Sequence, residues 1–311
     1  MKTAPREVGR RQVHRMSTRT PSTSAPREEV QPFNLDKFIA ASKPLDLTGI
    51  DLNDAGKYPI SPSEVAVLRY MQDTEFYTVH YMKALMETSA LADNEARAFM
   101  VCWGYEECYH GRALAKILEA TGHAASRRSI EEFARPRKMT EVIQDAGGRA
   151  LSMISSDFIA THMTWGAINE LTAVHAYTRL AELSANPILA QVARRIVKDE
   201  RRHFAFYYQQ ARRRLASPLA RRMATFSIRA LWEPVGGSMA PREERDFVGA
   251  YLFGDDEGRA RLKETDETIA KLPGMSWFSM VSEATNAGTA RTLAAGTPIH
   301  RPEPYREQVA A

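Results

Sequence analysis

The sequence predicts an all-α fold, a four-helix bundle with additional helices. Apolar residues recur at helical spacing over four long segments, 61–90, 93–122, 151–184 and 188–216. Capping residues and prolines mark the ends of these segments. Strand-like alternation is scarce before residue 273. Long helices joined by short connections favour antiparallel neighbours, which form two helical hairpins.

Composition limits the class of protein before any motif is considered. The 311 residues are 44% hydrophobic and 26% charged, and no run approaches the ~20 apolar residues of a membrane-spanning helix. We therefore expect no membrane insertion. The net charge of +4, from 42 basic and 38 acidic residues, is too balanced for a dedicated nucleic-acid binder. Cys102 and Cys108 lie on one predicted helix and should not pair, which fits a reducing, cytoplasmic setting.

The chain begins with a segment unlike the rest. Residues 1–30 are rich in Arg, Ser, Thr and Pro and nearly free of apolar side chains, so we expect a disordered basic tail. Organelle transit peptides share this composition, but Glu7, Glu28 and Glu29 argue against one. The helical domain is expected over 31–275 and an irregular tail over 276–311.

Local signals delimit the first two long helices and the segment after them. Ser61 is a good N-cap and Pro62 suits a first helical turn. Asp93 caps the second helix, and Gly122 is a natural stop. Residues 123–150 are more broken and have room for one or two short helices.

The same kinds of signal continue along the chain. The third helix should end before Asn186-Pro187, because the residue before a proline disfavours helical geometry. The fourth begins at Ile188, and Ser217-Pro218 begins a fifth. Weaker helical segments continue to about residue 272.

Two long helices carry the same short pattern. Glu107-x-x-His110 lies on the second helix and Glu200-x-x-His203 on the fourth. Residues i and i+3 share a helix face, so each pair can present a carboxylate and an imidazole to one point. A single Glu-x-x-His is weak evidence, because surface residues meet at this spacing by chance.

The positions of these acids on their helices strengthen the signal. Glu107 and Glu200 fall among apolar residues on the faces expected to form the core, as do Glu75 and Glu170 on the first and third helices. A buried carboxylate costs several kcal/mol unless its charge is compensated. Four such carboxylates in one core require cations.

Register predicts that the acids meet. Glu75 lies ~15 residues before the first hairpin turn and Glu107 ~13 residues into the second helix, so both are ~20 Å from the turn. Glu170 and Glu200 have nearly the same relation to the turn at Asn186. One Glu from each of two helices and Glu-x-x-His from each of two others is typical of ferritin-like di-iron or di-manganese bundles. Carboxylate and imidazole ligands favour iron or manganese over structural zinc.

Further side chains complete the predicted site. Metal-bound histidines usually donate their second N–H to a carboxylate, and Asp199 and Glu106 are candidates because each precedes a predicted ligand. Cys108 should point away from the metals. The other histidines on the long helices are interpreted as ordinary helix residues: His80, His162 and His175.

At these motifs the chain resembles the soluble acyl-carrier-protein desaturase family. Its members read EENRHG and DEKRHE where this chain reads EECYHG and DERRHF, and the similarity spans about residues 65–215. The resemblance implies a ferritin-like bundle with two Fe per chain. It makes the six motif residues the di-iron ligands: Glu75, Glu107, His110, Glu170, Glu200 and His203.

The same resemblance implies a reaction and partners. The reaction is O₂-dependent desaturation of a fatty acyl chain carried by acyl carrier protein, as in fatty acid biosynthesis. A ferredoxin-type protein would donate electrons, and the chain would form a homodimer. One departure is Ala173, where plastid members have Thr, with Thr172 beside it; Cys108 and Tyr109 also replace the usual polar pair.

Other functions of the same bundle remain open. A hydroxylase or N-oxygenase is the main alternative, and a ferroxidase or non-catalytic metal-binding protein is a further one. About 95 residues follow the fourth helix, unlike a storage ferritin. Leu114 stands where a ribonucleotide reductase subunit would have its radical Tyr, and the cysteines of a rubrerythrin are lacking.

Two groups of side chains suggest what the site would bind. A basic stripe opposite Glu200 is either a solvated face or a dock for an acidic carrier protein. It consists of Arg194, Arg195, Lys198, Arg201 and Arg202. An apolar lining would suit an alkyl chain, although a bundle core has the same composition. It consists of Met71, Met82, Phe99, Trp103, Met163 and Tyr177.

Overall fold

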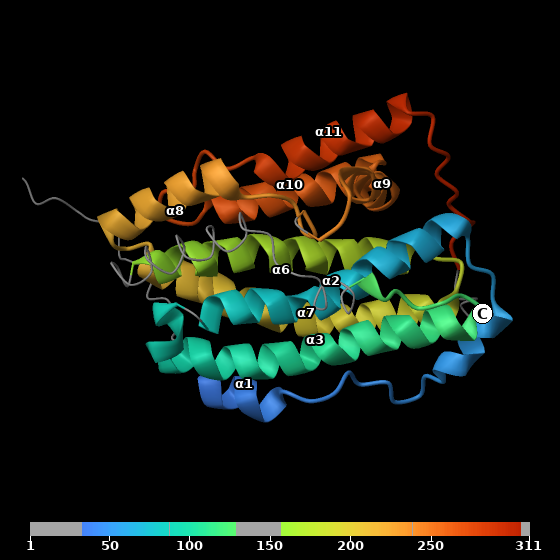
Figure 1. The fold of residues 1–311 in the computed structure, drawn as a ribbon, viewed down its shortest axis with the longest axis horizontal. Coiled ribbons are helices and arrows are strands. Elements are labelled where there is room, and N and C mark those ends of the chain that lie inside the picture. The colour runs from blue at the N-terminus through green and yellow to red at the C-terminus, as the bar shows by residue number, and fades with distance from the viewer. Residues whose placement is uncertain (1–32, 87, 129–156, 238, 306–311) are drawn as a thin grey trace, which may run out of the picture. The chain divides into compact units, whose positions relative to one another are not determined.

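The computed structural model describes residues 33–86, 88–128, 157–237 and 239–305. Helices account for the regular structure throughout these ranges, which contain no strand (Figure 1). The prediction of an all-α bundle with additional helices is confirmed. The described helices belong to one unit, residues 32–311. The predicted disordered tail, 1–30, lies outside the described residues, as does the start of the third helix at 151.

Four long helices form the bundle: α2 (Pro62–Met86), α3 (Asn94–Ala120), α6 (Phe158–Leu183) and α7 (Pro187–Arg214). α2 packs along α3, and α6 packs along α7. The predicted start of α2 is a capping box, because the Ser61 hydroxyl accepts from Glu64 N and the Glu64 carboxylate accepts from Ser61 N. Asp93 caps α3 and Asn186 caps α7 through their side-chain oxygens.

The ends of the helices in the first hairpin lie close to where the sequence predicts them. α2 ends at Met86, not at Ala90 as expected, and the short 3₁₀ helix η2 (Ser89–Ala92) leads into α3. At the far end of α3, Gly122 has φ +81°, a left-handed conformation that favours glycine and ends the helix. Both predicted punctuation points, Asp93 and Gly122, are confirmed.

Shorter helices cover the bundle on two sides (Figure 1). α1 (Leu35–Ala41) packs on α3, and the 3₁₀ helix η1 (Leu52–Lys57) contacts α3 and α7. On the opposite side lie α8 (Pro218–Leu231), α9 (Arg242–Phe253), α10 (Asp256–Ala270) and α11 (Met280–Ala294). α8, α9 and α10 contact α6, so they close the face of the bundle that α6 would otherwise expose.

The expectation of an irregular tail over 276–311 is wrong for half of its described part, residues 276–305. Residues Met280–Ala294 form α11, which packs on α9 and α10. Close approach explains the poor apolar pattern of this helix. A Cβ on Gly288 would lie 2.6 Å from Asp246 Oδ1, and one on Gly249 would lie 3.0 Å from Thr285 Cγ2. Small residues rather than an apolar stripe therefore hold α11 against α9.

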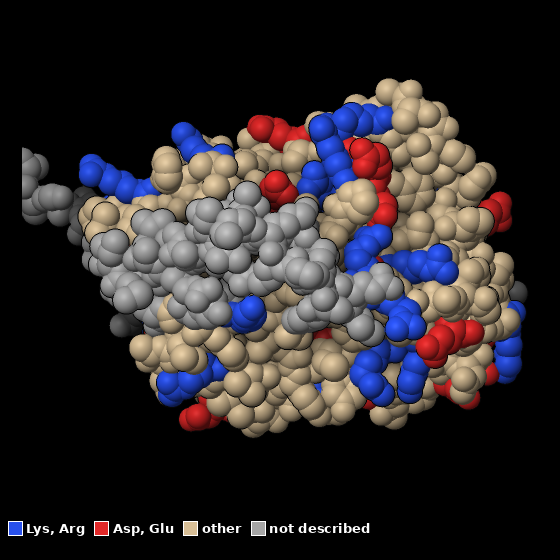
Figure 2. All heavy atoms as spheres, in the orientation of Figure 1, with Lys and Arg blue, Asp and Glu red and all other residues tan. Residues whose placement is uncertain are grey.

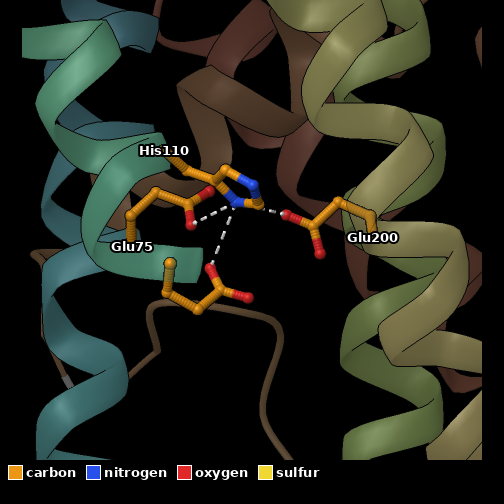
Figure 3. Close-up of side chains that lie close together, drawn as sticks. Glu75, His110 and Glu200 are labelled. Carbon is orange, nitrogen blue, oxygen red and sulfur yellow. Dashed lines mark ion pairs between the residues drawn. The ribbon is translucent and has the colours of Figure 1, made fainter. Parts of the chain in front are cut away.

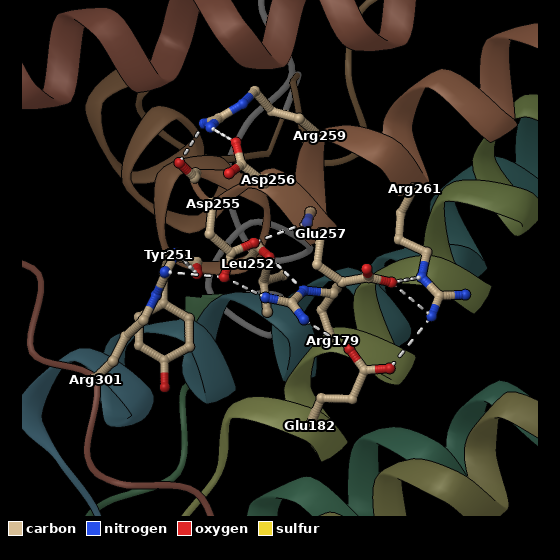
Figure 4. A network of polar contacts seen from close by, with 12 residues as sticks. Arg179, Glu182, Tyr251, Leu252, Asp255, Asp256, Glu257, Arg259, Arg261 and Arg301 are labelled. Atoms are coloured by element: carbon tan, nitrogen blue, oxygen red, sulfur yellow. Dashed lines mark hydrogen bonds and ion pairs between the residues drawn. The ribbon is translucent and has the colours of Figure 1, made fainter.

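After α11 the chain is irregular and returns along the bundle. His300 N donates to Ser63 Oγ at 2.9 Å, and Tyr305 N donates to Ser184 O at 3.0 Å. Arg301 reaches the α9–α10 junction, where it pairs with Asp255 (Figure 4). It also donates to Ala250 O. The buried Arg179 of α6 pairs with the same Asp255 (Figure 4). This segment thus connects the start of α2, the end of α6 and α9.

Two expectations from composition concern properties of the described helices. Every helix in these ranges is too short or too polar to cross a membrane. Cys102 and Cys108 are free, as expected. Cys108 is exposed on α3, so its side chain points away from the bundle interior as predicted.

Candidate metal centre

The six predicted ligand residues meet in the bundle core. They form two overlapping groups, one of Glu75, Glu107, His110 and Glu200 and the other of Glu107, Glu170, Glu200 and His203. In each group the candidate ligand atoms lie within 4.8 Å of one another, and all six side chains are buried. Glu107 and Glu200 belong to both groups, so both would help to hold either of two cations.

His110 lies at the centre of the first group. Its Nδ1 lies 3.6 Å from Glu75 Oε2, 3.6 Å from Glu107 Oε2 and 3.3 Å from Glu200 Oε1. Figure 3 shows Glu75 and Glu200 approaching the His110 imidazole from opposite sides, each from a different helix. The arrangement leaves Nδ1 as the atom available to a cation.

His203 has the equivalent place in the second group. Its Nδ1 lies 3.1 Å from Glu107 Oε1, 3.7 Å from Glu170 Oε2 and 3.3 Å from Glu200 Oε2. The centroids of the two imidazoles are 6.1 Å apart. Each imidazole therefore belongs to one candidate metal position, and the two positions share Glu107 and Glu200.

The second nitrogen of each histidine is held across the bundle by an acid from the other helix. His203 Nε2 of α7 lies 2.7 Å from Glu106 Oε2 of α3, and His110 Nε2 of α3 lies 3.3 Å from Asp199 Oδ2 of α7. These are the two acids that the sequence suggested for this role. Such contacts fix the ring orientation and leave each Nδ1 directed at the carboxylates.

Arg202 joins the two acids, which the sequence did not predict. Its Nη2 donates to Glu106 Oε1 at 3.0 Å and to Asp199 Oδ1 at 2.7 Å. The expectation that Arg202 belongs to an exposed basic stripe is wrong, because its side chain is half-buried in these contacts. Arg195 is also half-buried and pairs with Asp46. The exposed members of the predicted stripe are Arg194, Lys198 and Arg201.

Electrostatics in the core shows which groups need compensation. Burial, followed by repulsion from neighbouring carboxylates, raises the pKa of Glu75 well above its ordinary value. Burial raises the pKa of Glu170 in the same way. For His110 and His203, burial opposes the charged ring, but contacts with the surrounding carboxylates outweigh it and raise each pKa well above the ordinary value. With all four carboxylates ionised, their charge would exceed that of two imidazolium rings, so the raised pKa values of Glu75 and Glu170 mark the acids that lack a compensating cation.

The donor set fits a pair of cations. Glu75 Oε2 and His110 Nδ1 are buried 3.6 Å apart, and neither makes a hydrogen bond within the described part of the chain. The Tyr177 hydroxyl donates to the other Glu75 oxygen and so orients this carboxylate. Four carboxylates and two imidazoles are the donors that iron and manganese accept. A bound cation pair would satisfy the buried atoms that the protein leaves unpaired.

Two cavities reach the cluster. The larger, of about 530 Å³, borders all four ligand carboxylates and is walled by Tyr81, Trp103 and Trp165. The smaller, of about 110 Å³, lies between α2, α6, α9 and α11 and is lined mainly by apolar side chains. Glu75, Ala173 and Val235 line both cavities. The two cavities therefore adjoin beside the carboxylate cluster.

The predicted apolar lining is only partly in these walls. Met71 and Tyr177 line the smaller cavity, and Trp103 lines the larger. Met82, Phe99 and Met163 line neither of the two. Phe99 instead stacks on Phe206, with ring centroids 3.7 Å apart. For these three residues the alternative reading, ordinary packing side chains, fits the structure.

The histidines interpreted as ordinary helix residues lie outside both groups. His162 Nε2 and both ring nitrogens of His175 make no hydrogen bond within the described residues. Burial lowers the pKa of His162 to about 4 and also lowers that of His175. Neither has the ring of carboxylates that surrounds His110 and His203.

Comparison with protein-family models, curated proteins and solved structures found no match for this chain.

Proposed function

We propose that this protein is a di-iron, O₂-dependent oxidoreductase. The observation that carries the proposal is the pair of overlapping Glu/His groups, joined by Glu107 and Glu200 and bordered by a cavity. Bound iron would supply the activation of O₂, which no side chain provides. The donor set and its two positions support two Fe per chain.

The protein's own contribution is placement. Glu106 and Asp199 hold the two imidazoles, Arg202 joins these two acids, and Tyr177 holds Glu75. Fixed donors need little rearrangement when the charge at the centre changes. The aromatic walls of the larger cavity would limit the access of bulk water to a bound substrate, and with it side reactions.

An apolar chain is the substrate class that the cavities favour. A chain entering the larger cavity passes the carboxylates and can continue toward the smaller, mainly apolar one. With the motif resemblance, this favours a fatty acyl thioester on acyl carrier protein, from which two hydrogens are removed. O₂ would be reduced to two waters by those two hydrogens, two electrons from a ferredoxin-type donor and two protons from solvent.

The partners belong to the same proposal. The exposed Arg194, Lys198 and Arg201 on α7 would attract an acidic carrier protein, and salt would weaken that attraction. We place the enzyme in the cytoplasm as a homodimer, in line with its two free thiols and with the resemblance.

A mass measurement tests the reaction. Iron-loaded protein with reduced ferredoxin, O₂ and saturated acyl-carrier-protein substrates should give a product lighter by two hydrogens. The Glu107→Ala, Glu200→Ala double variant is the matched blank. A product heavier by one oxygen from ¹⁸O₂ would favour a hydroxylase. Ala173 motivates this alternative, because it lines both cavities where plastid desaturases have Thr. Consumption of O₂ with free Fe²⁺ alone, and every substrate unchanged, would favour a ferroxidase.

A further inference from the structure

The outer face of α8 exposes large apolar side chains. Leu219 is 52% exposed and Phe226 73%. Leu231, at the end of the helix, is 66% exposed but lies ~140° from Phe226 and lines the larger cavity, so it does not belong to this face. Phe226 is the most exposed large apolar residue in the described part of the chain. Leu219 and Phe226 are seven residues apart, two helical turns, so they project from the same side of the helix. Exposed apolar side chains gathered on one short helix indicate a binding surface rather than scattered surface residues.

These side chains are not used by the core. The inner face of α8 consists of Ala220, Ala224 and Ile228, all fully buried, and the helix packs on α6. Ser217 caps the helix by accepting from Ala220 N, and Pro218 occupies its first turn. α8 is therefore anchored through one face while its opposite face remains available.

Arginines border the exposed apolar residues. Arg222 and Arg229 are exposed within 100° of Phe226 around the helix, taking ~100° per residue. The Arg229 guanidinium lies 4.1 Å from the centre of the Trp277 ring, so an amphipathic indole lies next to this arginine. The sequence from Arg201 to Trp232 contains no Asp or Glu. At the end of the molecule that carries α8, Lys and Arg atoms project among tan atoms (Figures 1 and 2).

We propose that α8 binds the surface of an anionic phospholipid bilayer, lying in the plane of the membrane with Leu219 and Phe226 toward the acyl chains. Arg222 and Arg229 would contact the lipid phosphates, and Trp277 would lie at headgroup level. Amphipathic helices with Phe and Leu on one side and basic residues beside them bind in this way. The site is separate from the metal centre and holds whether or not the proposed reaction does.

The size of the surface favours a bilayer over a protein partner. α8 has 14 residues and is ~21 Å long, and its exposed apolar part is a ridge of a few side chains. A specific protein interface buries about 800 Å² on each partner and is usually built around a packed centre. Binding to a bilayer has no such minimum, since it grows with each inserted side chain and each phosphate contact.

Vesicle co-sedimentation with the full-length protein tests the proposal. We expect the protein to bind vesicles of mixed phosphatidylglycerol and phosphatidylcholine, and salt should weaken this binding. Binding to vesicles of phosphatidylcholine alone should be at least about tenfold weaker. Leu219→Ser with Phe226→Ser should lower binding to anionic vesicles by at least about tenfold. Arg222→Gln with Arg229→Gln should remove most of its dependence on salt.

A matched control uses charges elsewhere on the surface. Arg194→Gln with Lys198→Gln removes the same charge from α7 and should leave vesicle binding nearly unchanged, while all variants keep the wild-type helical circular dichroism. Equal binding by wild type and the α8 variants would overturn the proposal. It would also be overturned if wild type bound no vesicles and the Leu219, Phe226 variant turned a dimer into a monomer in light scattering. That outcome would assign the face to a second copy of the chain.

Discussion

Two pairs of histidines lie on the long helices, and their surroundings differ. His162 and His175 have lowered pKa values because burial disfavours the charged ring and little opposes it. His110 and His203 are fully buried, yet their pKa values are raised because carboxylates from other helices surround them. Burial alone therefore does not distinguish a functional histidine from a packing one. The arrangement of charged partners does.

The largest expected effect is loss of metal from the carboxylate-surrounded pair. The Glu107→Ala, Glu200→Ala variant removes both carboxylates that the two groups share. Elemental analysis should find about two irons per wild-type chain under the bundle pattern and close to none in the variant.

The other histidine pair provides the control for this experiment. His162→Gln with His175→Gln should keep the full iron content, since neither residue belongs to a candidate group. Full iron in the Glu107, Glu200 variant would show that the cluster is not the metal site.

A smaller effect is expected from Arg202, which contacts no candidate metal position but holds both supporting acids. Arg202→Gln should weaken iron affinity about 10- to 100-fold, because Glu106 and Asp199 would lose their shared partner and orient the imidazoles less well. Arg202→Lys should lie between Gln and wild type, since one ammonium replaces a forked donor. Competitive chelator titration measures the affinities.

The neighbouring Arg201 provides a matched variant. Arg201 is exposed, so Arg201→Gln makes the same chemical change without touching the acids. If both glutamine variants weakened iron equally, general loss of charge rather than positioning would explain the effect.

The smallest effect concerns pH and the packing histidines. In the folded protein His162 has a pKa of about 4, below its ordinary value near 6.5. Between these values the unfolded chain binds more protons, so the free energy of unfolding falls as pH falls below 6.5 and is fully present above it. From pH 7.5 to 5 the wild type should lose ~1–2 kcal/mol more than His162→Gln, since the side chain is half-buried.

Denaturant titration of the metal-free proteins measures this difference, because acid would otherwise also release metal. If the free energy of unfolding depended on pH in the same way for wild type and His162→Gln, His162 would be solvated in the folded protein. It would then no longer serve as an example of a histidine whose pKa is lowered by burial.

Much of the bundle can be predicted from local features of the sequence, namely helix-capping residues and the spacing of apolar side chains. Asp93 and Asn186 cap helices where their residue types predict, and Glu75, Glu107, Glu170 and Glu200 meet because equal distances from two turns place them at one height. Helical periodicity alone gives the face on which each acid lies. The caps and the pairing of acids within each hairpin follow from these local signals, whereas the meeting of the two pairs also depends on how one hairpin sits against the other.

The features that sequence reasoning missed depend on that relative placement. Arg202 lies on the outward side of α7 by periodicity, and only the position of α3 brings Glu106 within reach of it. α11 has no strong apolar stripe because Gly288 allows close packing on Asp246 instead. A signal did exist for Arg202, namely its place between two residues of the motif it supports.

The returning C-terminal segment has a consequence for the order of folding. Ser61 donates to the carbonyl of His300, across 239 residues, at the start of the helix that carries Glu75. During synthesis, α2 must wait for nearly the whole chain before this contact can form. Contacts so distant in sequence slow the search for the native state, and a partly made chain holds its acidic residues in an unfinished core. The anchoring of the start of α2 by the C-terminal segment should therefore be among the last steps of folding.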